Sequence, residues 1–525
     1  MDGRVGVTVL TISRDFVLGD GQRPAPEELQ AALEPRYSLV KDGRSRTLRR
    51  TWLDTFDWRL HRAGLTLELV TGRGPGQLVL TGADGERVTE PANGVRWPAL
   101  ATELPPGPVR SRLAEVSRER ALLPAARVVS SVASLRACNT DEKTVAWLTV
   151  DSSSVTAPAS AQLPGRLSVV PVRGYQAQAD RIARLLTGVN GVEPVALPQL
   201  DAALAAAGRY PGDYTGKIDV SLAGDMPARL ALATVLLRLL GTLEANVAGT
   251  VRDTDTEFLH DLRVAVRRTR TALKLAGSVL PGGMAAAFAP EFKWLGDATT
   301  PTRDLDVYLL HYPHMAASLT SASPAELAPF HDYLAQRRAQ EQRRLVRGLR
   351  SRRFGALTCT WREALTGLRA PRRGPTAAAL ASRVIRKAHR RVLARGGAIT
   401  DSSPSERLHD LRKRCKELRY ALEFFASLSD PGSYRQALRD LKDLQDVLGT
   451  FQDCQVQQHE IRLIAAEMMA DHGAAAVTLL AMGDLAGQIG RIERRTRREF
   501  TGRYAEFAGV ASRRRFDTLL TGAAA

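Results

Sequence analysis

The sequence lacks paired cysteines and phosphate-binding glycine loops, and each absence excludes a class of protein. Its four cysteines are scattered and form no Cys-x-x-Cys pair, which argues against a zinc site or a disulfide framework and fits a reducing cytoplasm. No P-loop, dinucleotide-binding glycine fingerprint or nucleophile elbow is present. Nucleotide-binding and acyl-transfer enzymes of those kinds are therefore not expected.

The sequence also has no long uninterrupted apolar run. The N-terminal apolar residues are followed at once by Arg14 and Asp15, which predicts a strand and not a signal peptide. The most apolar helical stretch, 230–243, contains Arg238 and is expected to be too short to span a bilayer. We expect a soluble, cytoplasmic protein with no membrane segment.

Positive charge is what the sequence has in excess, and its distribution is uneven. At 525 residues, two or three domains are expected. Residues 1–210 hold 26 Lys and Arg against 22 Asp and Glu, whereas the remainder holds 48 against 34. The net charge of +18 is therefore concentrated in the C-terminal part, which should attract a polyanion, although GC-rich coding also yields many arginines.

Two regions differ in their periodicity, which predicts an α+β protein of two domains. Up to residue 210, short segments with strand character alternate with Gly and Pro clusters; these segments are 5–17, 65–70, 77–80, 145–150 and 166–172. Segments 175–188 and 197–207 are predicted to be helical, and 211–227 is a predicted linker. From 228 to 515 the period is 3.6, and Pro or Gly breaks near 281, 301, 324, 371, 404 and 431 predict eight or so helices.

An internal duplication is the strongest signal in the helical region. The tetrapeptide His-Asp-Leu-Arg at 260–263 recurs at 409–412, an offset of 149 residues. At the same offset, 295–307 aligns with 444–456. We expect two related helical bundles, roughly 228–370 and 376–515, packed about a pseudo-two-fold axis.

Each copy carries a stripe of cations at helical spacing. The residues of the two stripes are His260, Arg263, Arg267, Arg270 and Lys274, then His409, Arg412, Lys416 and Arg419. Apolar residues at the same spacing should face the core; they are Leu262, Val266, Thr269 and Leu273, then Leu411, Cys415, Leu418 and Leu422.

These stripes predict phosphate binding. Arginine suits phosphate because its flat donor set is bidentate, and helical spacing places the charges roughly 5–6 Å apart, as a ladder for an extended phosphate chain. A solvated face with acidic partners is the alternative, but we expect no acids one turn away to neutralise the stripes. Glu423 replaces the cation that Lys274 provides in the first copy.

Other polar residues are expected to have structural roles. Asp304 and Asp306 should hold arginine side chains across the bundle and not bind a metal. The segment 311–314, His-Tyr-Pro-His, is predicted to be a loop without a metal. His260 and His409 have no evident nucleophile or orienting carboxylate, so phosphate contact or helix capping is expected. Neither a cofactor nor a metal is expected.

The helical region resembles the CHAD family over roughly residues 225–515. The resemblance rests on the two His-Asp-Leu-Arg helices, on 293–306 and on 441–456. It implies two four-helix bundles around a basic cavity that binds inorganic polyphosphate, with the nine stripe residues above as the cavity residues. It also implies a cytoplasmic protein associated with polyphosphate granules.

The region before it resembles a divergent CYTH domain, the antiparallel β-tunnel of triphosphate-processing metalloenzymes. The matching segment is 53–57, Leu-Asp-Thr-Phe-Asp. The family's opening Glu-x-Glu-x-Lys motif is replaced by Thr11, Ser13 and Asp15, and Glu68 stands where arginine is usual. Because Mg²⁺ requires anionic oxygen ligands, the resemblance implies a tunnel without catalytic activity.

Two alternatives remain open. One is non-specific nucleic-acid binding through phosphates, which the absence of aromatic residues from the stripes disfavours for single strands. The other is a residual triphosphatase, which dependence on Mg²⁺ would reveal.

Overall fold

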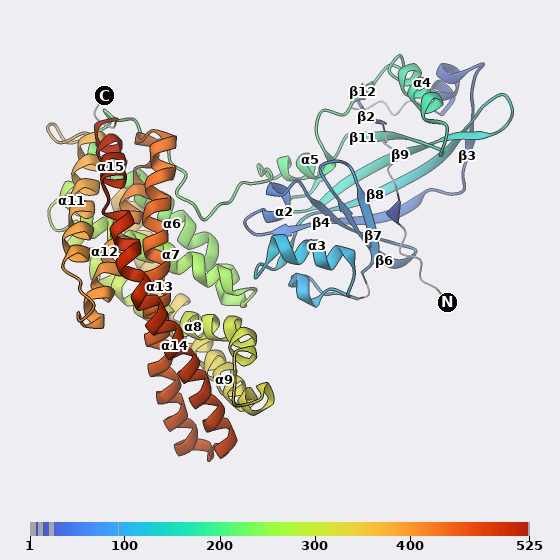
Figure 1. Cartoon of the computed structure of the whole chain (residues 1–525). Helices are drawn as coiled ribbons and strands as arrows, with labels where there is room; N and C mark the ends of the chain where they lie inside the picture. Colours follow the sequence, from blue (N-terminus) through green and yellow to red (C-terminus); the bar gives the residue numbers. More distant parts are fainter. Residues whose placement is uncertain (1–6, 9–13, 20–25, 93, 523–525) are drawn as a thin grey trace. The chain divides into compact units, whose positions relative to one another are not determined.

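The computed structural model describes residues 7–8, 14–19, 26–92 and 94–522 (Figure 1). The chain divides into two compact units, Met1–Thr215 and Gly216–Ala525. The boundary falls inside the segment 211–227. The first unit is built on an antiparallel sheet and the second is helical, which confirms the predicted α+β class.

Among its described residues, the first unit contains one twelve-stranded antiparallel sheet, which is visibly curved (Figure 1). Its hydrogen-bonded order is β1-β7-β6-β5-β4-β8-β9-β11-β2-β12, with β3 on β8 and β10 on β9. The strands are β1 (Val7–Thr8), β2 (Arg14–Leu18), β3 (Ser38–Lys41), β4 (Arg46–Thr55), β5 (Thr66–Gly72), β6 (Gly74–Thr81), β7 (Arg87–Pro91), β8 (Leu122–Cys138), β9 (Thr144–Ala157), β10 (Ala161–Gln162), β11 (Gly165–Pro171) and β12 (Val192–Pro194).

Short helices cover parts of this sheet. They are α1 (Pro26–Leu33), α2 (Arg59–Arg62), η1 (Ala101–Glu103), α3 (Pro108–Ser117), α4 (Gln176–Leu186) and α5 (Gln199–Ala205). Helix α4 is amphipathic and buries Ile182 and Leu186 in one core cluster with Leu167 and Val169 of β11. The sequence did not reveal β8, the longest strand, because alanine and serine at many of its positions weaken the polar–apolar contrast.

The second unit contains ten α-helices among the described residues. They are α6 (Ala228–Arg252), α7 (Thr256–Ala276), α8 (Met284–Ala317), α9 (Pro324–Leu349), α10 (Arg352–Thr366), α11 (Ala377–Gly397), α12 (Ser405–Phe424), α13 (Pro431–His472), α14 (Ala476–Phe507) and α15 (Val510–Gly522). Two 3-10 turns, η2 (Gly277–Val279) and η3 (Ala426–Leu428), follow α7 and α12. The prediction of eight or so helices was too low.

Two expected interruptions of the helical region are wrong. Pro301 and Pro313 both lie inside α8, so neither a break near 301 nor a loop at 311–314 is present. Proline removes a backbone donor, and packing can nevertheless keep such a helix continuous.

Helix α6 corrects another expectation. It runs for 25 residues and, among the described residues, is the one helix long and apolar enough to cross a membrane. Within the structure it is a core helix, since 56% of its most apolar window is buried. Leu232, Leu236 and Leu239 lie in the main core cluster of the unit.

Helices α6 and α11 begin with a reciprocal pair of hydrogen bonds. The amide of Ala228 donates to the carbonyl of Pro375 at 3.0 Å, and the amide of Ala377 donates to that of Met226 at 2.8 Å. The repeat offset relates the two bonds, because the donors Ala228 and Ala377 are 149 residues apart and so are the acceptors Met226 and Pro375. This exchange is the relation that a pseudo-two-fold axis produces.

A buried histidine makes the stability of this unit dependent on pH. His389 of α11 stacks on Phe516 of α15 at a ring distance of 4.0 Å. Burial lowers the pKa of His389 to about 4; Asp517 opposes this shift and Arg513 adds to it. The unfolded chain therefore takes up a proton on this imidazole near its ordinary pKa of 6.5, whereas the folded chain does so only near 4.

We accordingly predict that His389 destabilises the fold as the pH falls from 6.5 towards 4, while contributing no pH dependence above 7. In thermal unfolding followed by circular dichroism, His389→Phe should lose part of the acid sensitivity of the wild type. His331→Gln, at an exposed histidine, is the control and should retain it. Equal acid sensitivity of all three proteins would contradict the prediction.

Candidate functional site

Helices α7 and α12 carry the two predicted stripes, and local sequence explains where α7 begins. The carboxylate of Asp255 accepts hydrogen bonds from the amides of Glu257 and Phe258 and caps the helix. The predicted core-facing residues of both helices are buried, which confirms this part of the prediction; they are Leu262, Val266, Thr269, Leu273, Leu411, Cys415, Leu418 and Leu422.

A cavity of about 600 Å³ lies between α7, α12 and α13. It is lined by five of the nine predicted residues, namely His260, Arg267, Arg412, Lys416 and Arg419. The two copies of the repeat thus contribute cations to one concave surface. This convergence is a property of the tertiary structure, because the two stripes are about 150 residues apart in the chain.

The other four predicted residues do not line this cavity. Arg263 donates to the hydroxyl of Thr300 at 2.8 Å. Lys274 forms an ion pair with Glu417, with 2.5 Å between nitrogen and oxygen. Arg270 is exposed next to Gly296, and His409 packs edge-on against Phe451 at a ring distance of 6.4 Å.

Positive charges in the cavity are close enough to disturb one another. Burial, together with the charges of Arg412 and Arg267, lowers the pKa of Lys416 to about 8, while Asp453 acts in the opposite direction. Burial likewise lowers the pKa of the Arg263 guanidinium to about 10. Burial is the largest cause of both shifts, and neighbouring cations add to it in both cases.

Several cavity residues did not emerge as candidates from the sequence. They are Gly216, Asp261, Val264, Arg268, Tyr420, Glu423, Gln445, Asp446, Gly449, Thr450 and Asp453. Five of them belong to the repeated block 444–456 of α13. The repetition of that block could therefore have marked it as part of the site. Periodicity alone does not show which face of α13 contacts α12.

The acids of the repeated blocks orient arginines, as predicted. Arg412 contacts Asp453 at 3.1 Å, and the duplicated pair Arg263 and Asp304 lies at 4.0 Å. Asp306 is buried and contacts Arg338 of α9 at 2.8 Å. In the part of the chain that the structure describes, no group of three or more His, Cys, Asp or Glu is placed to hold a metal.

Two ion pairs join α7 to α12, and the repeat relates one pair to the other. Position 268 corresponds to position 417, and position 274 corresponds to position 423. Arg268 contacts Glu423 at 2.6 Å, and Lys274 contacts Glu417 at 2.5 Å. Both cations are on α7 and both acids are on α12, so the duplicated helices have opposite charges at equivalent positions. The expectation that no acid lies one turn from a stripe residue is wrong, because Arg419 donates to Glu423 at 2.9 Å.

In the first unit, a partly buried arginine lies between two carboxylates. Arg50 of β4 lies 3.0 Å from Asp151 of β9 and 3.4 Å from Glu68 of β5. Burial raises the pKa of Glu68, with Arg50 acting in the opposite direction. Of the three replaced motif positions, Asp15 lies on β2, whereas Thr11 and Ser13 are outside the described residues.

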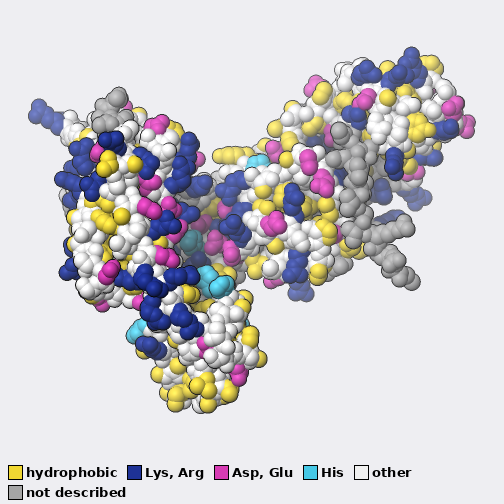
Figure 2. All heavy atoms as spheres, viewed as in Figure 1, with side chains coloured by type: hydrophobic (Ala, Val, Ile, Leu, Met, Phe, Trp, Pro, Cys, Tyr) yellow, Lys and Arg dark blue, Asp and Glu magenta, His cyan; other side chains and the backbone are white. Residues whose placement is uncertain are grey.

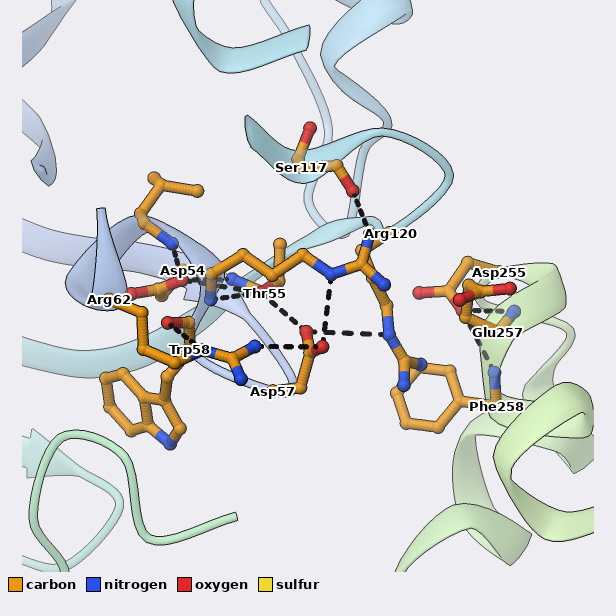
Figure 3. A network of polar contacts seen from close by, with 12 residues as sticks. Asp54, Thr55, Asp57, Trp58, Arg62, Ser117, Arg120, Asp255, Glu257 and Phe258 are labelled. Atoms are coloured by element: carbon orange, nitrogen blue, oxygen red, sulfur yellow. Dashed lines mark hydrogen bonds and ion pairs between the residues drawn. The ribbon is translucent and has the colours of Figure 1, made fainter. Parts of the chain in front are cut away.

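The acids of segment 53–57 have structural partners (Figure 3). The carboxylate of Asp54 accepts from the amides of Leu60 and His61, and burial raises its pKa to about 6 despite these bonds. Asp57 contacts Arg59 at 3.0 Å and Arg62 at 3.2 Å. These carboxylates hold the turn after β4 in place.

Comparison with protein families identifies the helical unit. The family model described as the CHAD domain matches residues 234–462. The helical unit contains a CHAD domain. The match includes α7, α12 and most of α13, so every element that lines the cavity belongs to it, and α14 lies beyond it.

Solved structures also resemble parts of the chain. The CHAD domain of the plant Ricinus communis is 26% identical, covering 55% of this chain and 95% of that one, with a TM-score of 0.47. PptA from Streptomyces chartreusis is 19% identical, covering 53% and 99%, with a TM-score of 0.41. A putative adenylyl cyclase from Hippeastrum, described as having a dominant triphosphatase activity, is 14% identical, covering 39% and 99%, with a TM-score of 0.26.

These three scores are below 0.5 and carry no weight in the functional argument. No curated protein matches the chain.

We predict that the pair formed by Arg268 and Glu423 stabilises the CHAD domain. Both side chains are largely buried, 11% and 12% exposed, so Arg268→Leu should lower the free energy of unfolding by about 1–3 kcal/mol. The swap Arg268→Glu/Glu423→Arg should recover part of the loss. Chemical denaturation measures both, and equal stability of Arg268→Leu and wild type would contradict the prediction.

Proposed function

We propose that the cavity between α7, α12 and α13 binds inorganic polyphosphate. The observation that carries this proposal is the convergence of His260, Arg267, Arg412, Lys416 and Arg419 on one concave surface. The lowered pKa of Lys416 supports it, because a group whose charge is disfavoured by its neighbours gains most from an incoming anion.

The donors in the cavity suit linked phosphates. Arginine meets two phosphate oxygens at once, and lysine adds a mobile point charge. Within α12, Arg412, Lys416 and Arg419 follow one face at intervals of roughly 5–6 Å. A flexible chain of phosphates can place an oxyanion near each of them, whereas a single phosphate meets only part of the set.

We further propose that the first unit is not a metal-dependent hydrolase. Glu68 and Asp151 already share Arg50, so a cation occupies the place at which these oxygens would bind Mg²⁺. A residual triphosphatase would release phosphate only with Mg²⁺ present. Absence of release from tripolyphosphate, with and without Mg²⁺, is the result that we expect.

The decisive experiment is titration of the full-length protein with long-chain polyphosphate at two salt concentrations. Arg267→Glu/Arg412→Glu should weaken binding by about 100-fold or more and reduce the salt dependence, because two phosphate contacts become repulsive. Arg343→Glu/Arg347→Glu, two exposed residues of α9, is the matched control with the same change of charge. The control should bind within a fewfold of wild type.

Single-stranded DNA serves as the competitor in the same titration. Displacement of polyphosphate by equal phosphate concentrations of DNA would favour a non-specific nucleic-acid surface instead. Equal losses in the cavity variant and the α9 control would mean that overall positive charge, and not the cavity, governs binding.

Polyphosphate binding should depend on pH through Lys416. The free cavity holds this amine with a pKa of about 8, and a bound polyanion raises it. Affinity should therefore be constant with respect to this group below pH 8 and should fall by up to about tenfold from pH 8 to 9.

Two substitutions test this pH dependence. Lys416→Arg should bind tightly without the loss above pH 8, and Lys416→Met should bind more weakly at all pH values with a flat profile. An unchanged profile in both variants would assign the titration to another group.

A further inference from the structure

A second arginine-lined pocket lies where α12 begins. It has a volume of about 580 Å³, and its lining residues are Ser403, Ser405, Phe451, Glu493, Arg494, Arg497 and Arg498. Three of these are arginines of α14, which lies outside the matched family model. Figure 2 shows Lys and Arg side chains gathered over the middle of α13 and α14.

The arginines of this pocket retain donors for an anion. In the described part of the chain, neither Arg494 nor Arg498 has a carboxylate at ion-pair distance, and both are exposed. Nη2 of Arg497 donates to the carbonyls of Thr400 and Ser403 at 2.8 and 2.9 Å, which fixes the guanidinium against the loop. Its Nη1 is buried and has no hydrogen-bond partner among the described residues.

The one carboxylate of the pocket does not neutralise these arginines. Glu493 accepts hydrogen bonds from the side-chain amides of Gln455 at 3.0 Å and Gln458 at 2.6 Å. Both oxygens are thereby directed towards α13. The pocket therefore has positive charge and free donors without an internal anion to meet them.

The duplication shows what kind of group is missing. In the first copy, the carboxylate of Asp255 caps α7 by accepting from the first amides of the helix. The position 149 residues later is Pro404, and α12 begins there without a side-chain cap. The first copy thus carries its own anion at this position, whereas α12 begins without a side-chain cap and next to three arginines.

The pocket lies on the continuation of the α12 stripe. Ser405 is one helical turn before His409, and His409 contacts Phe451, which lines the pocket. Ser405 and Arg412 are seven positions apart, which is about 10 Å along the helix. A phosphate chain that leaves the cavity along α12 would reach the pocket after passing His409.

We propose that this pocket holds a phosphoryl group of the same polyphosphate chain that occupies the cavity, and that it makes the domain select long chains over short ones. This inference rests on the proposed function. The first amides of α12, Arg494, Arg497 and Arg498 bind phosphoryl oxygens in the pocket. A chain of three phosphates fits within the cavity and gains nothing from the pocket.

The test compares tripolyphosphate with long-chain polyphosphate on the full-length protein. Arg494→Glu/Arg498→Glu should weaken long-chain binding by about tenfold or more and leave tripolyphosphate binding within about twofold of wild type. Arg343→Glu/Arg347→Glu has the same spacing and charge change on α9 and should leave the preference for long chains unchanged. Retained tripolyphosphate binding also shows that the pocket variant is folded.

Pro404→Asp is a second, independent variant. It gives α12 the cap that Asp255 gives α7, so it should raise the melting temperature. It should at the same time weaken long-chain binding. A variant that lost binding by unfolding would instead have a lower melting temperature.

Each other outcome has a definite meaning. A loss no greater than that of the α9 control, or equal losses for both chain lengths, would overturn the role of the pocket while leaving the cavity in place. Wild-type protein that binds neither chain would instead refute the proposed function.

Discussion

Helices α7 and α12 are the equivalent helices of the two repeat copies, and ion pairs join them. Which cations remain to line the cavity depends on these ion pairs. Arg268 and Lys274 of α7 pair with Glu423 and Glu417 of α12. If both copies had kept identical charges at these positions, like charges would meet at the interface and repel. The divergence of the two copies therefore favours pairing within one chain over pairing of α7 with α7 from another.

The same pairs determine which cations remain for a ligand. Lys274 and Arg268 are engaged by acids, whereas Arg267 and Lys416 have cationic neighbours and incomplete compensation. Part of the positive charge of α7 is thus paired with acids of α12, and other cations line the cavity.

The first unit differs from the CHAD domain in how it treats its buried charges. Arg50 is matched by Glu68 and Asp151, and Asp54 by backbone amides. Each of these carboxylates therefore has a cation or backbone amides as its partner within the unit. The helical unit, by contrast, has an excess of positive charge, since the chain after residue 210 holds 48 Lys and Arg against 34 Asp and Glu.

The sequence by itself determined the α+β class, the helical repeat and the buried faces of α7 and α12. These follow from local periodicity and from an offset shared by two blocks, which are readable without knowledge of packing. The alignment of the two blocks also placed Asp453 at the position of Asp304, which was predicted to hold an arginine. The break predicted at Pro301 and the loop predicted around Pro313 were wrong, because packing on neighbouring helices keeps α8 continuous through both prolines.

Only the tertiary structure decided which stripe residues line the cavity. Residues of one helical stripe point over a range of directions, so they can contact different neighbours. Four of the predicted residues have neighbours outside the cavity; they are Arg263, Arg270, Lys274 and His409. The pocket at the start of α12 joins residues that are about 90 positions apart in the chain. No local pattern encodes that proximity, since it arises from the packing of α14 beside α12 and α13.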